Sequence, residues 1–331
     1  MSETPRETLE RIAQGFVPAK VLFAAVELGL FDALPADGLA PEELATRLGL
    51  PERGVGILVW ALASLGLLEI VDGSRVRVAE RFAPLLADRE YVALLRHRGR
   101  LFRAWAVLEQ TIRQGRPAHD EPDALDDPEA NEAFILAMAA VSRERAPQVL
   151  ARLELDGASH LADLGGGPGL YVELALREHP RLRATLIDLP LTLEVARRRL
   201  AGRPELERLA FLRWDFYREP EPERPAGPFD RMLISQVLHA ESPENNRALF
   251  ARLAPLLATG ALVVIHENAR EPERWRPPAA ALFAVNMLAM TAGGDTYTVD
   301  EIAEQAAAGG LALLDSERLD ERSVVVRLRA R

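Results

Sequence analysis

Hydrophobic residues change their spacing along this chain near residue 155. Before that point they recur every three or four positions, as on the buried face of an α-helix. The pattern predicts helical segments over 21–34, 41–48, 55–71 and 133–153. We therefore expect the N-terminal half to be mostly helical.

After residue 155, short β-rich runs alternate with helical patterns. The runs cover 160–165, 183–189, 209–215, 230–235, 261–267, 311–319 and 323–329. Strands separated by helices of this length form βαβ units and a mainly parallel sheet. The last two runs have too short a connection for a crossover, so they should pair as an antiparallel hairpin. The C-terminal half is therefore expected to be an α/β domain.

A winged-helix pattern covers residues 39–82. It consists of a short helix, a turn, a longer helix, and two short strands on either side of Asp72-Gly73. Winged helices often bind DNA, but the helix that would enter the groove (54–66) has no basic residue, and Arg53 stands alone before it. We expect this apolar helix to pack against a neighbouring chain.

Composition narrows the classes of function. The chain has 331 residues, which predicts two domains, and it has no cysteine, which excludes disulfides and thiolate metal sites. Its net charge of −10 argues against a nucleic-acid partner. No apolar stretch is long enough for a membrane helix, and the N-terminus is polar and acidic. A cytoplasmic protein with a small-molecule partner is expected.

The sequence also predicts a polar, proline-rich surface loop over residues 218–228.

The stretch DLGGGPG (163–169) ends a predicted strand and opens a helix, where α/β sheets bind ligands. Its glycines let a ligand approach the backbone closely. Asp188, at the end of the next strand, is placed to accept ribose hydroxyls. A dinucleotide dehydrogenase and a purely structural turn both remain open on these residues alone. Asp215 closes the third strand, placed to accept from an adenine amino group while Phe216 packs on the ring, and this third acid favours S-adenosylmethionine.

Further motifs extend this pattern along the chain: LIDLP (186–190), RWDF (213–216), ISQVLH (234–239), VVIHE (263–267) and FAVNMLAMTAGGDTYT (283–298). In this order, the motifs resemble the bacterial branch of the small-molecule O-methyltransferases related to plant caffeate and acetylserotonin methyltransferases. The resemblance implies a class I methyltransferase domain with a Rossmann-like, mostly parallel seven-stranded sheet and an antiparallel last strand. It also implies an N-terminal helical, winged-helix dimerisation domain and a homodimer. We expect a dimerisation domain over 1–95, linking helices covering the active site over 96–154, and a cofactor-binding catalytic domain over 155–331.

The same resemblance assigns roles to individual residues. His239 would be the general base and Glu267 would orient it. The acceptor pocket would include Met138, Met287 and Met290. S-adenosyl-L-methionine, which leaves as S-adenosyl-L-homocysteine, would be held by Asp163, Gly165, Gly167, Asp188, Leu189, Asp215, Phe216 and Ser235.

The chemistry of a histidine base is consistent with this assignment. Free proton transfer from a phenol to an imidazole is uphill by roughly 5 kcal/mol, so deprotonation must be coupled to methyl transfer. An acid bonded to the other ring nitrogen would fix the tautomer and stabilise the cation. His266 neighbours Glu267 on a strand, so the two side chains should point to opposite faces.

The sequence departs from the plant pattern, in which a second acid flanks the histidine. Thr296 stands at that position with Asp295 beside it, and Ala240-Glu241 replaces the usual tryptophan segment after His239. O-methylation is therefore the first hypothesis and methylation of an activated carbon the second. A metal site formed by His239, His266 and an acid is a further alternative, and a non-catalytic cofactor-binding regulator is the third function considered.

Overall fold

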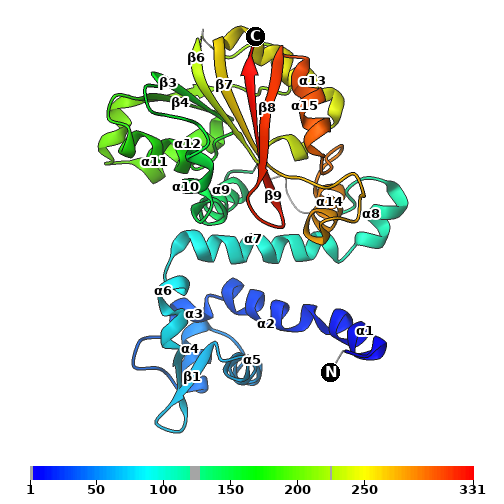
Figure 1. The fold of residues 1–331 in the computed structure, drawn as a ribbon. Coiled ribbons are helices and arrows are strands. Elements are labelled where there is room, and N and C mark those ends of the chain that lie inside the picture. The colour runs from blue at the N-terminus through cyan, green and yellow to red at the C-terminus, as the bar shows by residue number, and fades with distance from the viewer. Residues whose placement is uncertain (1–2, 120–126, 224–225) are drawn as a thin grey trace. The chain divides into compact units, whose positions relative to one another are not determined.

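The computed structural model describes residues 3–119, 127–223 and 226–331, and the chain divides into two compact units, 1–100 and 101–331 (Figure 1). Part of the expected linking region, 120–126, lies outside the described residues, as do 224–225 of the proline-rich segment. None of the helices within the described ranges is both long enough and apolar enough to cross a membrane.

The N-terminal unit is mainly helical and carries one small antiparallel hairpin. Helix α7 runs from this unit into the second. The elements are α1 (Pro5–Gln14), α2 (Phe16–Glu27), α3 (Leu30–Ala33), α4 (Pro41–Leu48), α5 (Glu52–Ser64), β1 (Leu68–Val71), β2 (Arg75–Val78), the 3-10 helix η1 (Glu80–Phe82), α6 (Ala83–Leu86) and α7 (Arg89–Trp105).

Local chemistry explains where the predicted helical segments of this unit end. The segment 21–34 is interrupted at Gly29, which has a φ of +68° and precedes a new short helix, α3. The helical spacing over 55–71 continues only to Ser64, because 68–71 form the first strand of the hairpin. Asp72 and Gly73 both have positive φ, as a tight hairpin turn requires. Leu30, Leu44, Val59 and Leu62 are fully buried in the core of this unit.

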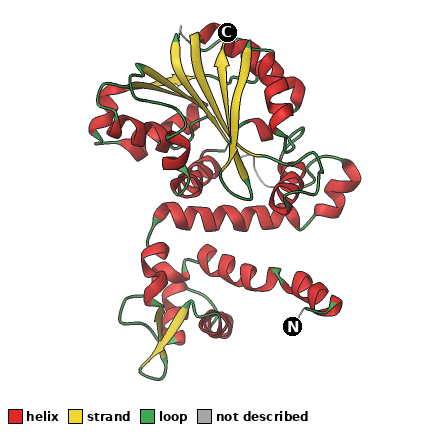
Figure 2. Ribbon diagram, viewed as in Figure 1, coloured by secondary structure: helices red, strands yellow, loops and turns green. Residues whose placement is uncertain are grey.

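The C-terminal unit is a sheet with helices on both faces (Figure 2). The predicted helical segment 133–153 is two helices, since Pro147 cannot continue the first one. The elements are α8 (Leu108–Gln114), α9 (Pro128–Arg143), α10 (Ala146–Leu150), β3 (His160–Leu164), α11 (Leu170–Glu178), β4 (Arg183–Asp188), α12 (Pro190–Leu200), η2 (Pro204–Arg208), β5 (Leu209–Arg213), β6 (Phe229–Ser235), η3 (Leu238–Ala240), α13 (Pro243–Leu253), η4 (Ala254–Leu256), β7 (Leu257–Asn268), α14 (Pro278–Met290), α15 (Val299–Ala307), β8 (Leu311–Arg318) and β9 (Ser323–Ala330).

The sheet has seven strands in the order β5-β4-β3-β6-β7-β9-β8. The pairs among β5, β4, β3, β6 and β7 are parallel, whereas β9 is antiparallel to both β7 and β8. The predicted fold class, including the antiparallel last strand, is confirmed. The strand order reverses between β3 and β6, and a crevice outside the carboxyl ends of parallel strands at such a point binds ligands.

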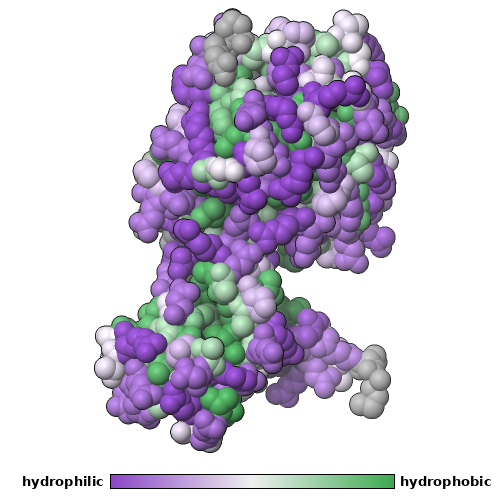
Figure 3. All heavy atoms as spheres, turned by 90° about the vertical axis from the view of Figure 1, so that its left-hand side faces the viewer, coloured by the Kyte–Doolittle hydropathy of each residue, from purple (hydrophilic) through white to green (hydrophobic). Residues whose placement is uncertain are grey.

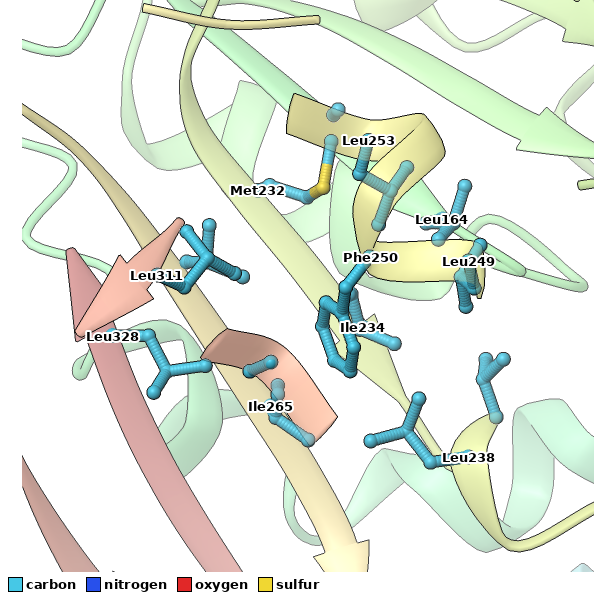
Figure 4. Close-up of a cluster of buried hydrophobic side chains, with 14 of the residues drawn as sticks. Leu164, Met232, Ile234, Leu238, Leu249, Phe250, Leu253, Ile265, Leu311 and Leu328 are labelled. Carbon is cyan, nitrogen blue, oxygen red and sulfur yellow. The ribbon is translucent and has the colours of Figure 1, made fainter. Parts of the chain in front are cut away.

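Two hydrophobic cores lie on opposite faces of this sheet. Helices α10, α11 and α12 cover one face, where Leu161 and Val264 are fully buried. Helices α13 and α15 cover the other face, and Figure 4 shows the Phe250 ring of α13 among Ile234, Leu249 and Leu253. Because side chains alternate along each strand, the two faces also carry different polar residues at the strand ends.

Arg208 fastens η2 to the end of α11. Its guanidinium donates to the carbonyl oxygens of Leu176, His179 and Leu182 at 2.6, 2.9 and 2.9 Å. Two of these carbonyls lie in or next to the last turn of α11, where backbone acceptors lack helical partners.

We expect Arg208→Ala to lower the free energy of unfolding by about 1–3 kcal/mol, because it removes charge-assisted hydrogen bonds from three carbonyls. Thermal denaturation would measure the loss. Arg181→Ala, at an exposed arginine nearby, is the matched control and should leave the melting temperature unchanged. Equal melting of the two variants would contradict the role given to Arg208.

Candidate active site

The loop after β3 needs its glycines. Gly165, Gly167 and Gly169 have φ of +67°, +53° and +73°, in the left-handed region that side chains disfavour. At Gly166 an added Cβ would lie 2.5 Å from Asp163 Oδ2, closer than real contacts allow. The loop therefore presents bare backbone at the carboxyl end of β3.

Asp163 lies beneath this loop with no exposed surface. Neither of its carboxylate oxygens has a hydrogen-bond partner among the described residues. Burial, and then the nearby charge of Asp188, raises the pKa of Asp163 to about 8. A buried acceptor pair of this kind calls for a donor, and the ammonium group of S-adenosylmethionine is a donor of the right charge. The residues at the loop thus fit that cofactor.

Asp188 ends β4 and is tied to the glycine loop. Its carboxylate accepts from the Gly167 N–H at 2.9 Å and from the Leu189 N–H at 2.8 Å. Burial raises its pKa to about 6, although these bonds and one from Thr192 act in the opposite direction. Asn131 of α9 donates to the Thr192 hydroxyl at 3.3 Å, so α9 is linked to the same acid.

Asp215 does not close the third strand as predicted. Strand β5 ends at Arg213, and Asp215 begins a turn in which its carboxylate accepts from the Arg218 N–H at 3.1 Å. The turn still delivers Phe216 to the glycine loop, since a Cβ at Gly165 would lie 3.4 Å from the Phe216 ring. Asp215 is therefore a turn residue beyond the strand rather than its last residue.

His239 and Glu267 are brought together at the ends of β6 and β7. His239 Nδ1 lies 2.7 Å from Glu267 Oε2, and Glu267 Oε1 accepts from the N–H groups of Val237 and Leu238, both at 2.7 Å. Gln236 has a φ of +59°, and this left-handed residue turns the two following N–H groups toward the carboxylate. Burial alone would raise the pKa of Glu267, but the His239 ring and the backbone donors outweigh burial and lower it.

The other neighbours of His239 come from α14 and the loop after it. The rings of His239 and Phe283 meet edge to face at 4.9 Å. The Asp295 N–H donates to the His239 carbonyl at 3.1 Å, and a Cβ at Gly294 would lie 2.3 Å from the same oxygen. Thr296 is fully buried, and its hydroxyl has no hydrogen-bond partner in the described part of the chain. The acid bonded to the imidazole is thus Glu267.

The three methionines predicted for the acceptor pocket lie on two helices. Met138 is on α9, and Met287 and Met290 are on α14, the helix that also carries Phe283. Met287 is buried, whereas Met138 and Met290 are half-buried. Trp105 Nε1 donates to Asn286 Oδ1 at 3.0 Å, which holds the end of α7 against α14.

His266 points away from the His239 pair. Its Nδ1 lies 3.0 Å from Ser235 Oγ and 3.5 Å from the Tyr171 hydroxyl, on the opposite face of β7 from Glu267. Across the described ranges, no group of three or more acidic or histidine side chains could hold a metal ion. The metal alternative, which needed His266 beside His239, has no support in this geometry.

Several contacts at the site were not predicted from the sequence. Tyr171, Thr192, Asn131 and Gln236 all touch predicted site residues through side chains or backbone turns. Tyr171 is the one with a sequence signal, because it stands two residues after the last glycine of the loop. The others become recognisable only when strands and helices are brought together.

Comparison with known proteins gives one consistent result. Residues 108–312 match the O-methyltransferase domain family, and residues 10–84 match the O-methyltransferase dimerisation domain. A 3-hydroxy-5-methyl-1-naphthoate 3-O-methyltransferase of Streptomyces sahachiroi is 31% identical over 299 residues, which cover 88% of this chain and 85% of the relative. An acetylserotonin O-methyltransferase of Gallus gallus is 27% identical over 316 residues, which cover 90% of this chain and 90% of the relative.

Solved structures agree with the sequence matches. Mitomycin 7-O-methyltransferase has a TM-score of 0.85 at 27% identity, with 98% of each chain covered. An O-methyltransferase family protein from Burkholderia thailandensis has a TM-score of 0.84 at 26% identity, with 99% of each chain covered. With the catalytic-domain match covering more than half of its length, this chain belongs to the S-adenosylmethionine-dependent O-methyltransferases that carry a dimerisation domain.

Proposed function

We propose that this enzyme transfers the methyl group of S-adenosylmethionine to a hydroxyl of an aromatic or polyketide-like small molecule, with His239 as the general base. The observation that carries the proposal is the 2.7 Å contact between His239 Nδ1 and Glu267 Oε2. A neutral imidazole has one donor and one acceptor nitrogen, so a carboxylate at Nδ1 fixes the proton there. Nε2 is then left to accept a proton from the acceptor hydroxyl.

Glu267 orients the base and stabilises its charged form. Two backbone N–H groups hold one of its oxygens, so the other oxygen and the imidazole have little freedom. The lowered pKa of Glu267 keeps the carboxylate ionised while His239 gains a proton. A fixed negative charge beside the ring favours proton uptake during methyl transfer.

The cofactor site proposed here lies at the glycine loop. When bound, S-adenosylmethionine supplies an electrophilic methyl group on a sulfonium. Bare backbone at Gly165 and Gly167 would allow its close approach, Asp188 and the adjoining Leu189 would meet the ribose, and the Asp215–Phe216 turn would meet the adenine. Ser235 would lie at the amino-acid end of the molecule.

The acceptor would lie between His239 and helices α9 and α14. Phe283 beside the imidazole supports an aromatic acceptor, since its ring could pack against another ring. Met138, Met287 and Met290 are proposed to shape the rest of the pocket, because methionine adapts to irregular apolar ligands. The name of the naphthoate-methylating relative points to the same class of acceptor. We also propose that 1–95 is the dimerisation domain, that 155–331 is the catalytic domain, and that the linking helices of 96–154 cover the active site. The bond from Asn131 of α9 to Thr192 supports the role of the linking helices.

The assembly proposed is a homodimer formed through the N-terminal unit. Helix α1 has no buried residue, yet Leu9 and Ile12, spaced to lie on one side of it, are 69% and 65% exposed. Trp60 of α5 is also 47% exposed. Figure 3 shows hydrophobic side chains reaching the surface of this unit on the face in view. Exposed apolar surface of this kind is typical of the interfaces of obligate dimers.

We expect His239→Ala to lower kcat by about 10²–10⁴-fold and to leave cofactor affinity nearly unchanged, because a lost general base affects only proton removal. The loss should shrink at high pH, where the acceptor hydroxyl ionises unaided. Steady-state kinetics from pH 6 to 10 would measure both effects. Glu267→Gln should follow the same course more mildly, and the double variant should be little worse than His239→Ala.

His179→Ala is the matched control, because His179 is a half-buried histidine paired with exposed Asp156. It should keep full activity. If His239→Ala retains most activity at every pH, proton removal by this residue is not limiting, and methylation of a carbon atom takes precedence.

S-adenosylhomocysteine should raise the melting temperature of the enzyme and NAD should not, because only a ligand of the native state stabilises it. Asp188→Ala should weaken S-adenosylhomocysteine binding in titration calorimetry by removing the acceptor for the ribose hydroxyls. Asp156→Ala, at an exposed acid of the same unit, should bind normally. Stabilisation by NAD alone would rule out the proposed cofactor site.

Light scattering should report a dimer at micromolar concentration, and Leu9→Glu combined with Ile12→Glu should produce monomers, since two buried charges oppose the interface. Gln14→Glu, a new charge elsewhere on α1, should remain dimeric. A wild-type monomer at this concentration would refute the assembly.

A further inference from the structure

A buried polar cluster lies on the face of the sheet opposite His239. It joins Ser235 of β6, His266 of β7, Tyr171 of α11 and Ser142 of α9. Tyr171 is 4% exposed and His266 3%, whereas Ser235 is only half-buried. The proposed base does not use this cluster, and hydroxyl and imidazole groups this deep in a hydrophobic core call for a function.

The Tyr171 hydroxyl is the hydrogen-bonding centre of the cluster. The Tyr171 oxygen accepts from Ser235 Oγ at 3.2 Å, and the Ser142 hydroxyl is a second hydrogen-bonding neighbour of the phenol. The phenol also has one hydrogen of its own to donate, in addition to the bond that it accepts from Ser235. His266 Nδ1 is 3.5 Å away, which is too long for a strong bond. The Tyr171 O–H can therefore turn toward an anionic oxygen that comes within reach, since its weak contact with His266 is easily replaced.

His266 can orient this chain of donors. Its Nε2 is buried and has no partner in the described residues. A buried bare acceptor is tolerated better than a buried unpaired N–H, so the tautomer with the proton on Nδ1 is favoured. Nδ1 then donates to Ser235 Oγ at 3.0 Å, Ser235 donates to Tyr171, and the donors run in one direction.

Asp163 lies close to the Tyr171 end of this series of hydrogen bonds. It pairs with Leu233 across β3 and β6, two residues before Ser235 and on the same face. Its charge is near enough to contribute to the raised pKa of the Tyr171 phenol, which burial raises most. An acid with two unpartnered oxygens and a phenol with a hydrogen to donate thus lie in the same neighbourhood below the glycine loop.

We propose that Tyr171, held by Ser235 and His266, binds the carboxylate of the amino-acid end of S-adenosylmethionine, while Asp163 binds its ammonium. An α-amino acid presents one anion and one cation a short distance apart, which matches this pair of groups. The inference rests on the cofactor site proposed above and adds Tyr171 and His266 to it.

The charges in the neighbourhood agree with the proposal. Burial lowers the pKa of His266 to about 4, so the imidazole stays neutral at physiological pH and can orient the hydroxyls without trapping an anion itself. The nearby guanidinium of Arg145 is paired with Asp320 at 2.6 Å. Neutral donors and one buried acid therefore face the zwitterion.

Binding of three ligands by titration calorimetry tests the proposal. The ligands are S-adenosylmethionine, its decarboxylated form, which keeps the ammonium, and 5′-methylthioadenosine, which lacks the amino-acid end. Tyr171→Phe should weaken S-adenosylmethionine binding by about ten- to a hundredfold, as expected for a lost hydrogen bond to a charged group. It should leave binding of the other two ligands unchanged. Asp163→Asn should weaken binding of both ligands that carry the ammonium and spare 5′-methylthioadenosine.

His266 provides a finer test of the donor chain. His266→Asn keeps a donor near the Nδ1 position and should retain most of the affinity, whereas His266→Gln should lose it. Tyr91→Phe in the N-terminal unit is the control for loss of a phenol and should bind all three ligands normally.

If Tyr171→Phe weakens all three ligands equally, or none of them, the carboxylate assignment is wrong. That outcome would leave the proposed function intact, because the tests of methyl transfer and of the His239 variants use an enzyme in which Tyr171 is unchanged.

Kinetics give a second measure of the same assignment. With saturating cofactor, Tyr171→Phe should keep kcat and raise only the KM for S-adenosylmethionine.

Discussion

The buried carboxylate of Glu267 is the constraint around which the catalytic end of the sheet is arranged. It is 1% exposed, so its charge must be met by donors within the protein. Two successive backbone N–H groups meet one oxygen, which requires the left-handed turn at Gln236, and His239 meets the other. The position of the imidazole therefore follows from the need to pair a buried charge within the fold.

The alternation of side chains on β7 separates two kinds of chemistry. Glu267 faces the core covered by α13 and α15, with His239, whereas His266 faces the core covered by α11, with Ser235 and Tyr171. Neighbouring residues on one strand thus reach the proposed base and a polar cluster on opposite faces of the sheet. A parallel sheet permits this because the carboxyl ends of several strands share one edge.

Much of this could be predicted from the sequence, for identifiable reasons. Apolar runs marked the seven strands because buried parallel strands are continuous in hydrophobicity, and the spacing of His239 and Glu267 reflected adjacent strand ends. The end of β5 was misplaced because Trp214 is as apolar as a strand residue, although Asp215 already starts a turn. Thr192, Gln236 and Tyr171 act through tertiary contacts or an unusual φ, which leave no periodic signal in the chain.

The loop after α14 is attached to His239 through its backbone. Gly294 lies against the His239 carbonyl without room for a Cβ, and Asp295 donates to the same oxygen. Since α14 also supplies Phe283 beside the imidazole, the proposed acceptor pocket and the proposed base share one set of packed contacts. If His239 is the base, as proposed, a shift of α14 that admits a new acceptor also displaces the base. A change of specificity in this enzyme then requires a compensating change in the turn that carries His239.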